Sequence, residues 1–380
     1  MARMRTEGFC APQFERVRDA FVANFNEGSE LGASVAITRD GAPVVDLWAG
    51  DAVQGGAPWQ RDTIVNVYST TKTMAALCVL MLADRGALDL DAPVARYWPE
   101  FAQNGKDGVL VRHVMSHSAG LSGFDPPLAS VTDLYDREAI VRRLAAQKPW
   151  WAPGDGSGYH AITQGFLQGE IVRRVTGKTL GAFFREEVAQ PLGADFHIGL
   201  APEHDARVAE LVPPPVGLDA TPGDPASVGV RTMKSCALTG FEPRTPGWRR
   251  AEIPAAGGVG NARSVARVHA ALACGGAVDG VRLLSEAGLR RALEEQTNGV
   301  DRVLNAPVRF GMGFGLPHPS IPLSPNPNVI YWGGWGGSLA IIDLDARVSI
   351  AYAMNRMAPG VMGDLRGAMI VLAAYKALAG

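Results

Sequence analysis

Ser69 and Lys72 place a hydroxyl group and an amine three residues apart at the start of an apolar run. On a helix, residues at this spacing lie on one face, about one turn apart. A serine hydroxyl becomes an effective nucleophile when a neighbouring base takes its proton, and a lysine amine can be that base. Free backbone N–H groups at a helix start also favour negative charge on the serine oxygen. The pair therefore predicts nucleophilic catalysis by Ser69.

The residues after Lys72 decide whether its amine can act as a base. Met74 to Leu82 is continuously apolar and is followed by Arg85 and Gly86, which predicts a buried helix with an ordinary C-terminal stop. Burial disfavours a charged amine and lowers its pKa from an ordinary value of about 10.4. The alternative is that a serine and a lysine meet by chance at an exposed helix start.

Two further segments carry groups that such a reaction needs. Tyr159 lies between a glycine-rich turn and an apolar helix, and its phenol can exchange a proton with Lys72. Trp332-Gly333-Gly334-Trp335 is expected to open the penultimate strand, where glycines let the backbone approach a ligand and donate an N–H to an oxyanion. The alternatives are a core tyrosine with a satisfied hydroxyl and a bulge at a sheet edge.

Aromatic residues near these motifs are candidates for the walls of a substrate pocket. Each of them is equally compatible with an ordinary place in the core, and a lone histidine is most often simply hydrogen-bonded. Besides Trp332 and Trp335, the candidates are Phe124, Trp150, Trp151 and His160.

Composition narrows the class of protein. The chain has 380 residues, a net charge of −2 and interspersed charges, which argues against nucleic acid and against an anionic membrane surface as partners. No apolar run reaches the length of a membrane span, and the first ten residues lack the apolar part of a signal peptide, so a cytoplasmic protein is expected. The four cysteines show no C-x-x-C spacing, and His113 and His117 lack the glutamate of a zinc motif. Neither a cofactor nor a metal is expected.

Both chain ends predict a hairpin with a helix. An amphipathic helix from Phe14 to about Asn26 precedes apolar strands at 33–37 and 44–48, and strands at 339–342 and 348–352 precede a final helix at 362–378. The middle shows helical periodicity at 138–146, 165–175, 180–188 and 264–273. These patterns predict an antiparallel sheet built from both ends, flanked by helices, with a helical insertion. We expect a discontinuous α/β domain at 1–66 and 235–380, a mainly helical domain at 67–234 and an active site in the cleft between them.

Taken in this order, the three motifs resemble those of the serine β-lactamase and penicillin-binding-protein superfamily, and most closely its family VIII carboxylesterases. The resemblance implies the β-lactamase/transpeptidase-like fold and a covalent acyl-Ser69 intermediate. It also implies Lys72 and Tyr159 as general base and acid, in roles that the sequence does not assign, and N–H groups of Ser69 and Trp335 as oxyanion donors. Further segments similar to the family are His117-Ser118-Ala119-Gly120-Leu121, Pro153 to Gly177, Phe310 to Gly315 and Asn355-Arg356-Met357.

Two departures from the lactam-recognising relatives point to the substrate. Their second motif is Tyr-x-Asn, but Ala161 stands at the third position here, so the amide that holds a lactam side chain is missing. Their third motif begins with Lys or His, but Trp332 offers no charge. Trp335-Gly336-Gly337 also fits this motif, although the distance to Asp343 favours Trp332. Both losses favour neutral, short-chain esters.

Three alternatives stay open on these residues. A β-lactamase or penicillin-binding protein with weak β-lactam turnover, or an amidase or acyltransferase, would use the same groups. A non-catalytic binding protein is disfavoured because Ser69 and Lys72 are both present. A Ser-His-Asp hydrolase is disfavoured because no G-x-S-x-G pentapeptide occurs. The physiological ester, the oligomeric state and the role of the Pro- and Gly-rich segment at 213–230 are not predicted.

Overall fold

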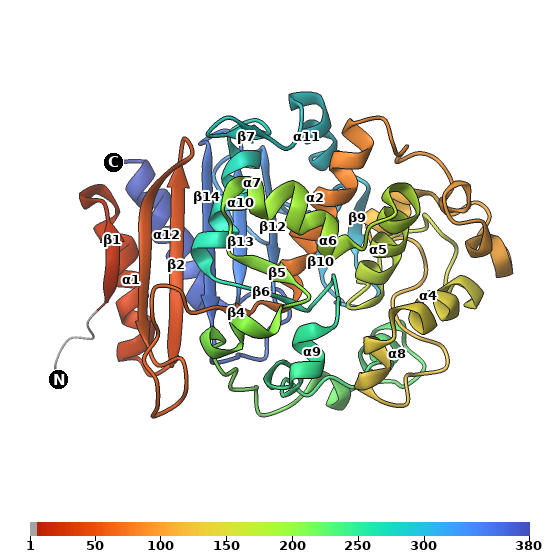
Figure 1. Ribbon diagram of the computed structural model, residues 1–380, viewed down its shortest axis with the longest axis horizontal. Coiled ribbons are helices and arrows are strands. Elements are labelled where there is room, and N and C mark those ends of the chain that lie inside the picture. Colours follow the sequence, from red (N-terminus) through yellow and green to blue (C-terminus); the bar gives the residue numbers. More distant parts are fainter. Residues whose placement is uncertain (1–5) are drawn as a thin grey trace.

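A nine-stranded antiparallel sheet joins the two ends of the chain in the computed structural model, which describes residues 6–380 apart from the side chain of Asp219 (Figure 1). The two predicted hairpins meet where β14 pairs with β2, with Ile350 opposite Ile37. The sheet expected from both chain ends is therefore confirmed. In spatial order the strands are β1 (Glu7–Cys10), β3 (Ala42–Gly50), β2 (Gly32–Arg39), β14 (Val348–Met354), β13 (Leu339–Asp343), β12 (Val329–Gly333), β11 (Gly315–Leu316), β10 (Pro307–Phe310) and β9 (Thr297–Val300).

Helices cover both faces of this sheet, which is why its central strands β2 and β14 are buried along almost their whole length. Helix α10 (Ala262–Ala273) packs on β2, β13 and β14 from one face. Helices α1 (Glu15–Asn26) and α12 (Leu365–Leu378) pack together behind the sheet in Figure 1, at the end of the molecule where both termini lie.

A helical part lies beside the sheet, on the right of Figure 1. The predicted helices are present, although the one expected at 180–188 divides into α6 and a π-helical turn at Arg185–Ala189. The two-domain boundaries stay a prediction. The remaining elements are α2 (Thr71–Asp84), α3 (Val111–Met115), α4 (Arg137–Ala146), α5 (Thr163–Thr176), α6 (Leu180–Phe184), α7 (Gln190–Leu192), α8 (Val228–Lys234), α9 (Pro246–Arg250) and α11 (Glu286–Ala292), with short strands β4 (Val65–Asn66), β5 (Phe196–Ile198), β6 (Gly258–Gly260), β7 (Ala277–Val278) and β8 (Val281–Arg282).

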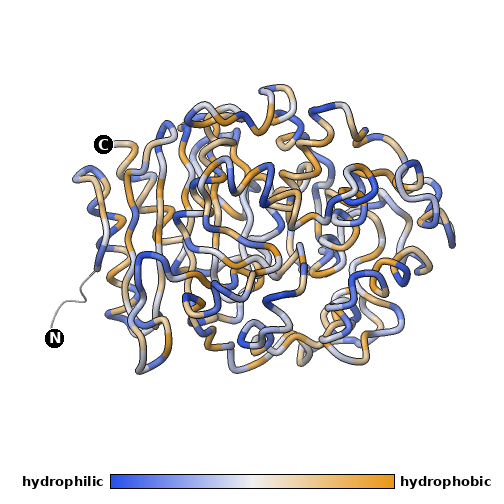
Figure 2. Tube along the Cα trace, in the orientation of Figure 1, coloured by the Kyte–Doolittle hydropathy of each residue, from blue (hydrophilic) through white to orange (hydrophobic). Residues whose placement is uncertain are grey.

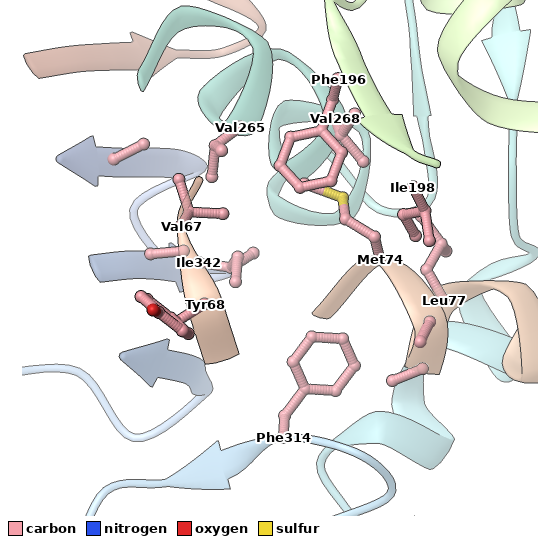
Figure 3. Close-up of a cluster of buried hydrophobic side chains, with 14 of the residues drawn as sticks. Val67, Tyr68, Met74, Leu77, Phe196, Ile198, Val265, Val268, Phe314 and Ile342 are labelled. Carbon is pink, nitrogen blue, oxygen red and sulfur yellow. The ribbon is translucent and has the colours of Figure 1, made fainter. Parts of the chain in front are cut away.

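The core of the molecule runs through α2, whose residues 71–82 are all buried. Figure 3 shows Met74 and Leu77 of this helix among side chains from α10, β5 and β13. The hydropathy colours of Figure 2 show apolar stretches along the central strands and helices and polar ones along many outer loops. Among the described residues, no helix combines the length and the apolar character that crossing a bilayer requires.

One strand assignment from the sequence is wrong. The segment Trp332-Gly333-Gly334-Trp335 was expected to open the penultimate strand, but Trp332 and Gly333 close β12, and Gly334 and Trp335 begin the turn that leads into β13. The reason is that Val329–Gly333 pairs with both β13 and β11 and is a strand in its own right.

Candidate active site

The segment that carries Ser69, the predicted nucleophile, is called the nucleophile segment here. It passes from β4 through a short 3-10 turn, Tyr68–Thr70, into α2. Tyr68 adopts a positive φ of 42°, a conformation that costs energy for a residue with a side chain. The surrounding core holds it: the Tyr68 ring packs edge-on against Trp335 at 5.0 Å, and the ring points into the core in Figure 3. Ser69 therefore lies at a sharp, rigid bend ahead of the helix and is 7% exposed.

Lys72 lies one turn after Ser69, as the spacing predicts, with its Nζ 3.1 Å from Ser69 Oγ. Two N–H bonds of the amine point to backbone carbonyls, at 2.7 Å from Ala161 O and 2.9 Å from Ala255 O. Burial in the apolar core lowers the pKa of Lys72 well below its ordinary value. The amine also donates to Ser69 Oγ, so three acceptors surround it. Once the amine is neutral, the two carbonyls hold its two hydrogens and its lone pair can turn to Ser69.

Tyr159 reaches Ser69 from the other side, donating its phenolic hydrogen to Ser69 Oγ at 2.6 Å. The phenol is buried, and this desolvation raises its pKa above the ordinary value, although the hydrogen bond to Ser69 opposes the shift. Lys72 Nζ lies 4.9 Å from the centre of the Tyr159 ring. The structure thus brings the three predicted catalytic residues together, with a protonated phenol and an amine on either side of one hydroxyl.

Asp301 holds the backbone of Tyr159 in place, and sequence analysis did not identify it. Its Oδ1 accepts the N–H groups of Tyr159, Val303 and Leu304 at 3.0, 2.8 and 2.9 Å. Its Oδ2 is buried without a hydrogen-bond partner among the described residues. The acidic side chain also opposes ionisation of the phenol, adding to the raised pKa of Tyr159. A single aspartate 142 residues from the tyrosine carries no local signal for this role.

His117 packs behind Tyr159, with its ring stacked on Trp332 at 5.3 Å and edge-on to Tyr159 at 5.1 Å. Its Nδ1 accepts the His160 N–H, and His160 Nε2 accepts the Leu121 N–H. Burial lowers the pKa of both imidazoles, that of His160 to about 3, so both rings are neutral. His160 is therefore a buried hydrogen-bonding residue behind the site.

The glycine-rich turn between β12 and β13 packs directly on the nucleophile segment. A Cβ on Gly334 would lie 2.3 Å from Val67 O, so only glycine fits. Ser338 Oγ donates to the same carbonyl at 2.8 Å and accepts the Thr70 hydroxyl, also at 2.8 Å. A Cβ on Gly333 would meet the carbonyl of Met362 at 2.4 Å. These contacts tie the turn to Ser69 through its neighbours on both sides.

Trp332 and Trp335 take different places around this turn. Trp332 is fully buried behind Tyr159, and its indole nitrogen makes no hydrogen bond of normal geometry within residues 6–380. The indole N–H nevertheless lies near enough to the phenol to oppose the rise in the pKa of Tyr159. Trp335 lines the cavity beside Ser69. Its backbone N–H makes no hydrogen bond to any described residue.

The cavity beside Ser69 is narrow and apolar, with a volume of about 20 Å³, little more than one water molecule needs. Leu218 lines it, so the Pro- and Gly-rich segment forms part of its wall. Of the other wall candidates, Phe124 lines an adjoining cavity, whereas Trp150, Trp151 and His160 line neither. The lining residues are Tyr68, Ser69, Tyr159, Ala161, Ile162, Leu218, Met233, Leu238, Ala256, Trp335 and Val361.

Comparison with known proteins places these features in a family. The chain is 37% identical to the esterase/beta-lactamase LipL of Mycobacterium tuberculosis over 96% of its own length and 87% of that protein. It is 30% identical to esterase EstB of Burkholderia gladioli, with 92% of each chain covered. A solved family VIII carboxylesterase superposes with a TM-score of 0.91 at 42% identity, covering 98% of this chain and all of the other.

A penicillin-binding protein homolog from Caulobacter crescentus superposes equally well, with a TM-score of 0.92 and 40% identity over 98% of this chain and 100% of that one. These similarities confirm the β-lactamase-like fold that the motifs imply. The beta-lactamase family model matches residues 17–375, almost the whole chain. The chain therefore belongs to the beta-lactamase family, with esterases and a family VIII carboxylesterase among its relatives.

Proposed function

We propose that this protein is a serine carboxylesterase that cleaves short-chain, neutral esters through a covalent acyl-Ser69 intermediate. The observation that carries the proposal is the position of Ser69 Oγ, 3.1 Å from Lys72 Nζ and 2.6 Å from the Tyr159 hydroxyl. One nucleophile between an amine and a phenol is the arrangement that general acid–base acyl transfer requires. The names of the esterase relatives support the same reaction.

Lys72 is the general base of the free enzyme in this proposal, and Tyr159 is the general acid. Burial lowers the pKa of the amine and raises that of the phenol, which favours an amine free to accept a proton and a phenol that still holds one. Ser69 donates to Lys72 and accepts from Tyr159. The sequence leaves this choice open, and the directions of the two pKa shifts support the assignment proposed here.

Acylation then proceeds with a balanced set of bonds. Ser69 Oγ bonds to the ester carbonyl carbon as its proton passes to Lys72. When the tetrahedral intermediate collapses, the bond to the alcohol oxygen breaks and Tyr159 protonates that oxygen. Lys72 returns its proton to Tyr159, and water repeats the sequence to release the acid and regenerate Ser69.

The developing oxyanion is held by the N–H groups of Ser69 and Trp335. Ser69 lies in the first turn of a 3-10 segment, where N–H groups have no partner inside the helix. The Trp335 N–H makes no hydrogen bond to the described residues and belongs to a residue that lines the cavity. A donor of this kind contributes about 3 kcal/mol to the transition state.

The cavity supports a preference for small, neutral acyl groups. Its lining residues contain no lysine, arginine or histidine that could pair with a substrate carboxylate. Ala161 lines the cavity with a methyl group, where lactam-recognising relatives present a side-chain amide. The apolar side chains that line the cavity, among them Ile162, Leu218 and Met233, suit a small apolar acyl group.

Weak β-lactam turnover is the second candidate, because the acyl-transfer residues do not distinguish an ester from a lactam. One relative is named as both an esterase and a beta-lactamase. The absence of a cation among the cavity's lining residues predicts slow acylation by lactams, since their carboxylate finds no partner there.

The test is intact mass spectrometry after brief incubation with p-nitrophenyl acetate, alongside steady-state hydrolysis, for the wild type and Ser69→Ala. We expect a burst of p-nitrophenol and an acetyl adduct in the wild type, and neither in the variant. A chromogenic cephalosporin in a parallel reaction measures the lactam activity. Undiminished ester hydrolysis by Ser69→Ala would refute the proposed mechanism.

A further inference from the structure

Arg366, at the start of α12, lies almost completely buried beneath the turn that carries Trp335. Its Nη2 donates to the Gly336 carbonyl at 2.7 Å and to Asp364 Oδ2 at 2.5 Å. Its Nη1 donates to Glu30 Oε1 at 2.9 Å and to two further backbone carbonyls. A buried guanidinium with every N–H group of its planar fork engaged is held in one orientation.

The Gly336 carbonyl connects this guanidinium to the oxyanion donor through two peptide groups. The peptide that contains this carbonyl also contains the Gly337 N–H, which donates to the Gly334 carbonyl at 3.1 Å. The Gly334 carbonyl in turn belongs to the peptide that contains the Trp335 N–H. In a trans peptide the N–H points away from the C=O, so a donor fixed on the Gly334 carbonyl directs the Trp335 N–H to the opposite side.

Further bonds hold the same turn. The Gly336 carbonyl also accepts the Ala358 N–H at 2.9 Å, and the Gly336 N–H donates to Gly360 at 3.0 Å. Gly336 and Gly337 have φ values of +99° and +129°, in the region that favours glycine. A Cβ on Gly337 would lie 2.6 Å from Arg366 Nη2, so the turn and the guanidinium are packed in contact.

We propose that Arg366 is a positioning residue for ester hydrolysis, which acts through the Gly336 and Gly334 carbonyls to orient and polarise the Trp335 N–H toward the oxyanion. Successive hydrogen bonds polarise one another in a low-dielectric interior, so a positive charge at one end strengthens the donor at the other. The inference rests on the proposed function, because it assigns the Trp335 N–H to the oxyanion of the acyl-Ser69 reaction.

The test compares Arg366→Lys with the wild type in two measurements. The first is kcat/KM for p-nitrophenyl acetate. The second is affinity for a small trifluoromethyl ketone, which forms a tetrahedral oxyanion on Ser69, against affinity for the methyl ketone of the same shape. We expect kcat/KM and the trifluoromethyl ketone affinity to fall together by about 10- to 100-fold, less than the loss of a whole oxyanion donor. The methyl ketone affinity should change by less than about 2-fold.

Arg249→Lys is the matched control. Arg249 is also largely buried and binds a carboxylate and backbone carbonyls, through Asp205, Pro243 and Arg244, but it makes no contact with the turn. We expect it to lower thermal stability without changing the ratio of the two ketone affinities. If Arg366→Lys behaves like this control, Arg366 has only a structural role and the proposal fails.

Two outcomes separate this proposal from the proposed function. If the wild type forms no acyl adduct on Ser69, the proposed function fails, and the proposal for Arg366 fails with it. If the wild type acylates and the Arg366 variant loses nothing in the ketone comparison, only the inference on Arg366 fails. If Arg366→Lys does not fold, the double variant Glu30→Gln with Arg366→Met removes both charges of the buried Arg366–Glu30 ion pair together. The same comparison of ketone affinities in this variant then tests the role of Arg366.

Discussion

The hydrogen bond between the Thr70 and Ser338 hydroxyls links the nucleophile segment to the turn that carries Trp335, and mutation can test this link directly. Ser338→Ala removes the acceptor of the Thr70 hydroxyl and one donor to the Val67 carbonyl. That carbonyl keeps the Thr70 N–H at 3.2 Å, so the main loss is one buried hydroxyl left without a partner. Such a loss costs about 1–3 kcal/mol of folding stability.

Thr70→Val and the variant with both substitutions complete a double-mutant cycle. Thr70→Val preserves the volume of the side chain and leaves the Ser338 bond to Val67 intact, so we expect a smaller loss, of about 1 kcal/mol. In the double variant no hydroxyl is stranded. The double loss should therefore be smaller than the sum of the single losses by about 1 kcal/mol, the size typical of groups in direct contact.

The assay combines urea unfolding, followed by circular dichroism, with the rate of the p-nitrophenol burst. We expect Ser338→Ala to slow acylation by about 10-fold. The turn that carries Trp335 loses its side-chain hydrogen bonds to the nucleophile segment, and a small displacement of the Trp335 N–H from the oxyanion lowers the rate of acyl transfer. Thr70→Val should slow it less. Additive effects on both stability and burst rate would show that the two hydroxyls do not act together, and would refute the coupling inferred from their 2.8 Å contact.

Three further predictions concern protonation. The proposed mechanism needs a neutral Lys72 and a protonated Tyr159. In a pH–rate profile, kcat/KM should therefore fall as pH drops through the lowered pKa of Lys72 and stay level into the alkaline range; a loss of kcat/KM just above neutral pH would contradict the assignment. Asp301→Asn keeps the acceptor for the Tyr159 N–H but removes a charge that opposes phenolate formation, so the alkaline limb should begin at lower pH than in the wild type, and an unmoved limb would exclude this electrostatic role. Burial raises the pKa of Glu30 from 4.5 to about 8 against the opposing effect of Arg366. Since the folded pKa is the higher one, Glu30 destabilises the fold increasingly as pH rises from 4.5 to about 8, and Glu30→Gln should flatten the decline in Tm over this range; equal slopes for both proteins would count against a raised pKa.

The sequence predicted those parts of the site that depend on short-range spacing. Ser69 and Lys72 are three residues apart, so their contact follows from helix geometry. The continuous apolar run after them predicts a buried helix, so the burial of the Lys72 amine follows from the local sequence as well. The hairpins at the two ends follow from alternation and turn residues in the same way. The similar pattern at the two chain ends, together with the family resemblance, predicts one sheet built from both. The strands at which the ends meet, β2 and β14, come from the structure alone.

The parts that could not be predicted depend on contacts between distant segments. Asp301 reaches Tyr159 across 142 residues, and Arg366 reaches Gly336 across 30, and neither residue stands in a recognisable motif. The prediction of aromatic residues that line the substrate pocket rests on residue type and on closeness to the motifs in sequence. Neither property shows which way a side chain points. Trp332 and Trp335 illustrate this, since residues three apart at a tight turn face a buried cluster and the cavity respectively.

The charges around Ser69 explain why backbone donors matter so much in this site. Burial lowers the pKa of Lys72, His117 and His160 and raises that of Tyr159, so it disfavours the charged form of each. Burial therefore works against a resting cation beside Ser69. In the proposed mechanism the Ser69 proton passes to Lys72 as the oxyanion forms on the substrate, and the groups that face the oxyanion itself are oriented N–H dipoles. A carboxylate on the substrate would lack such a partner, which is the physical reason to expect neutral esters.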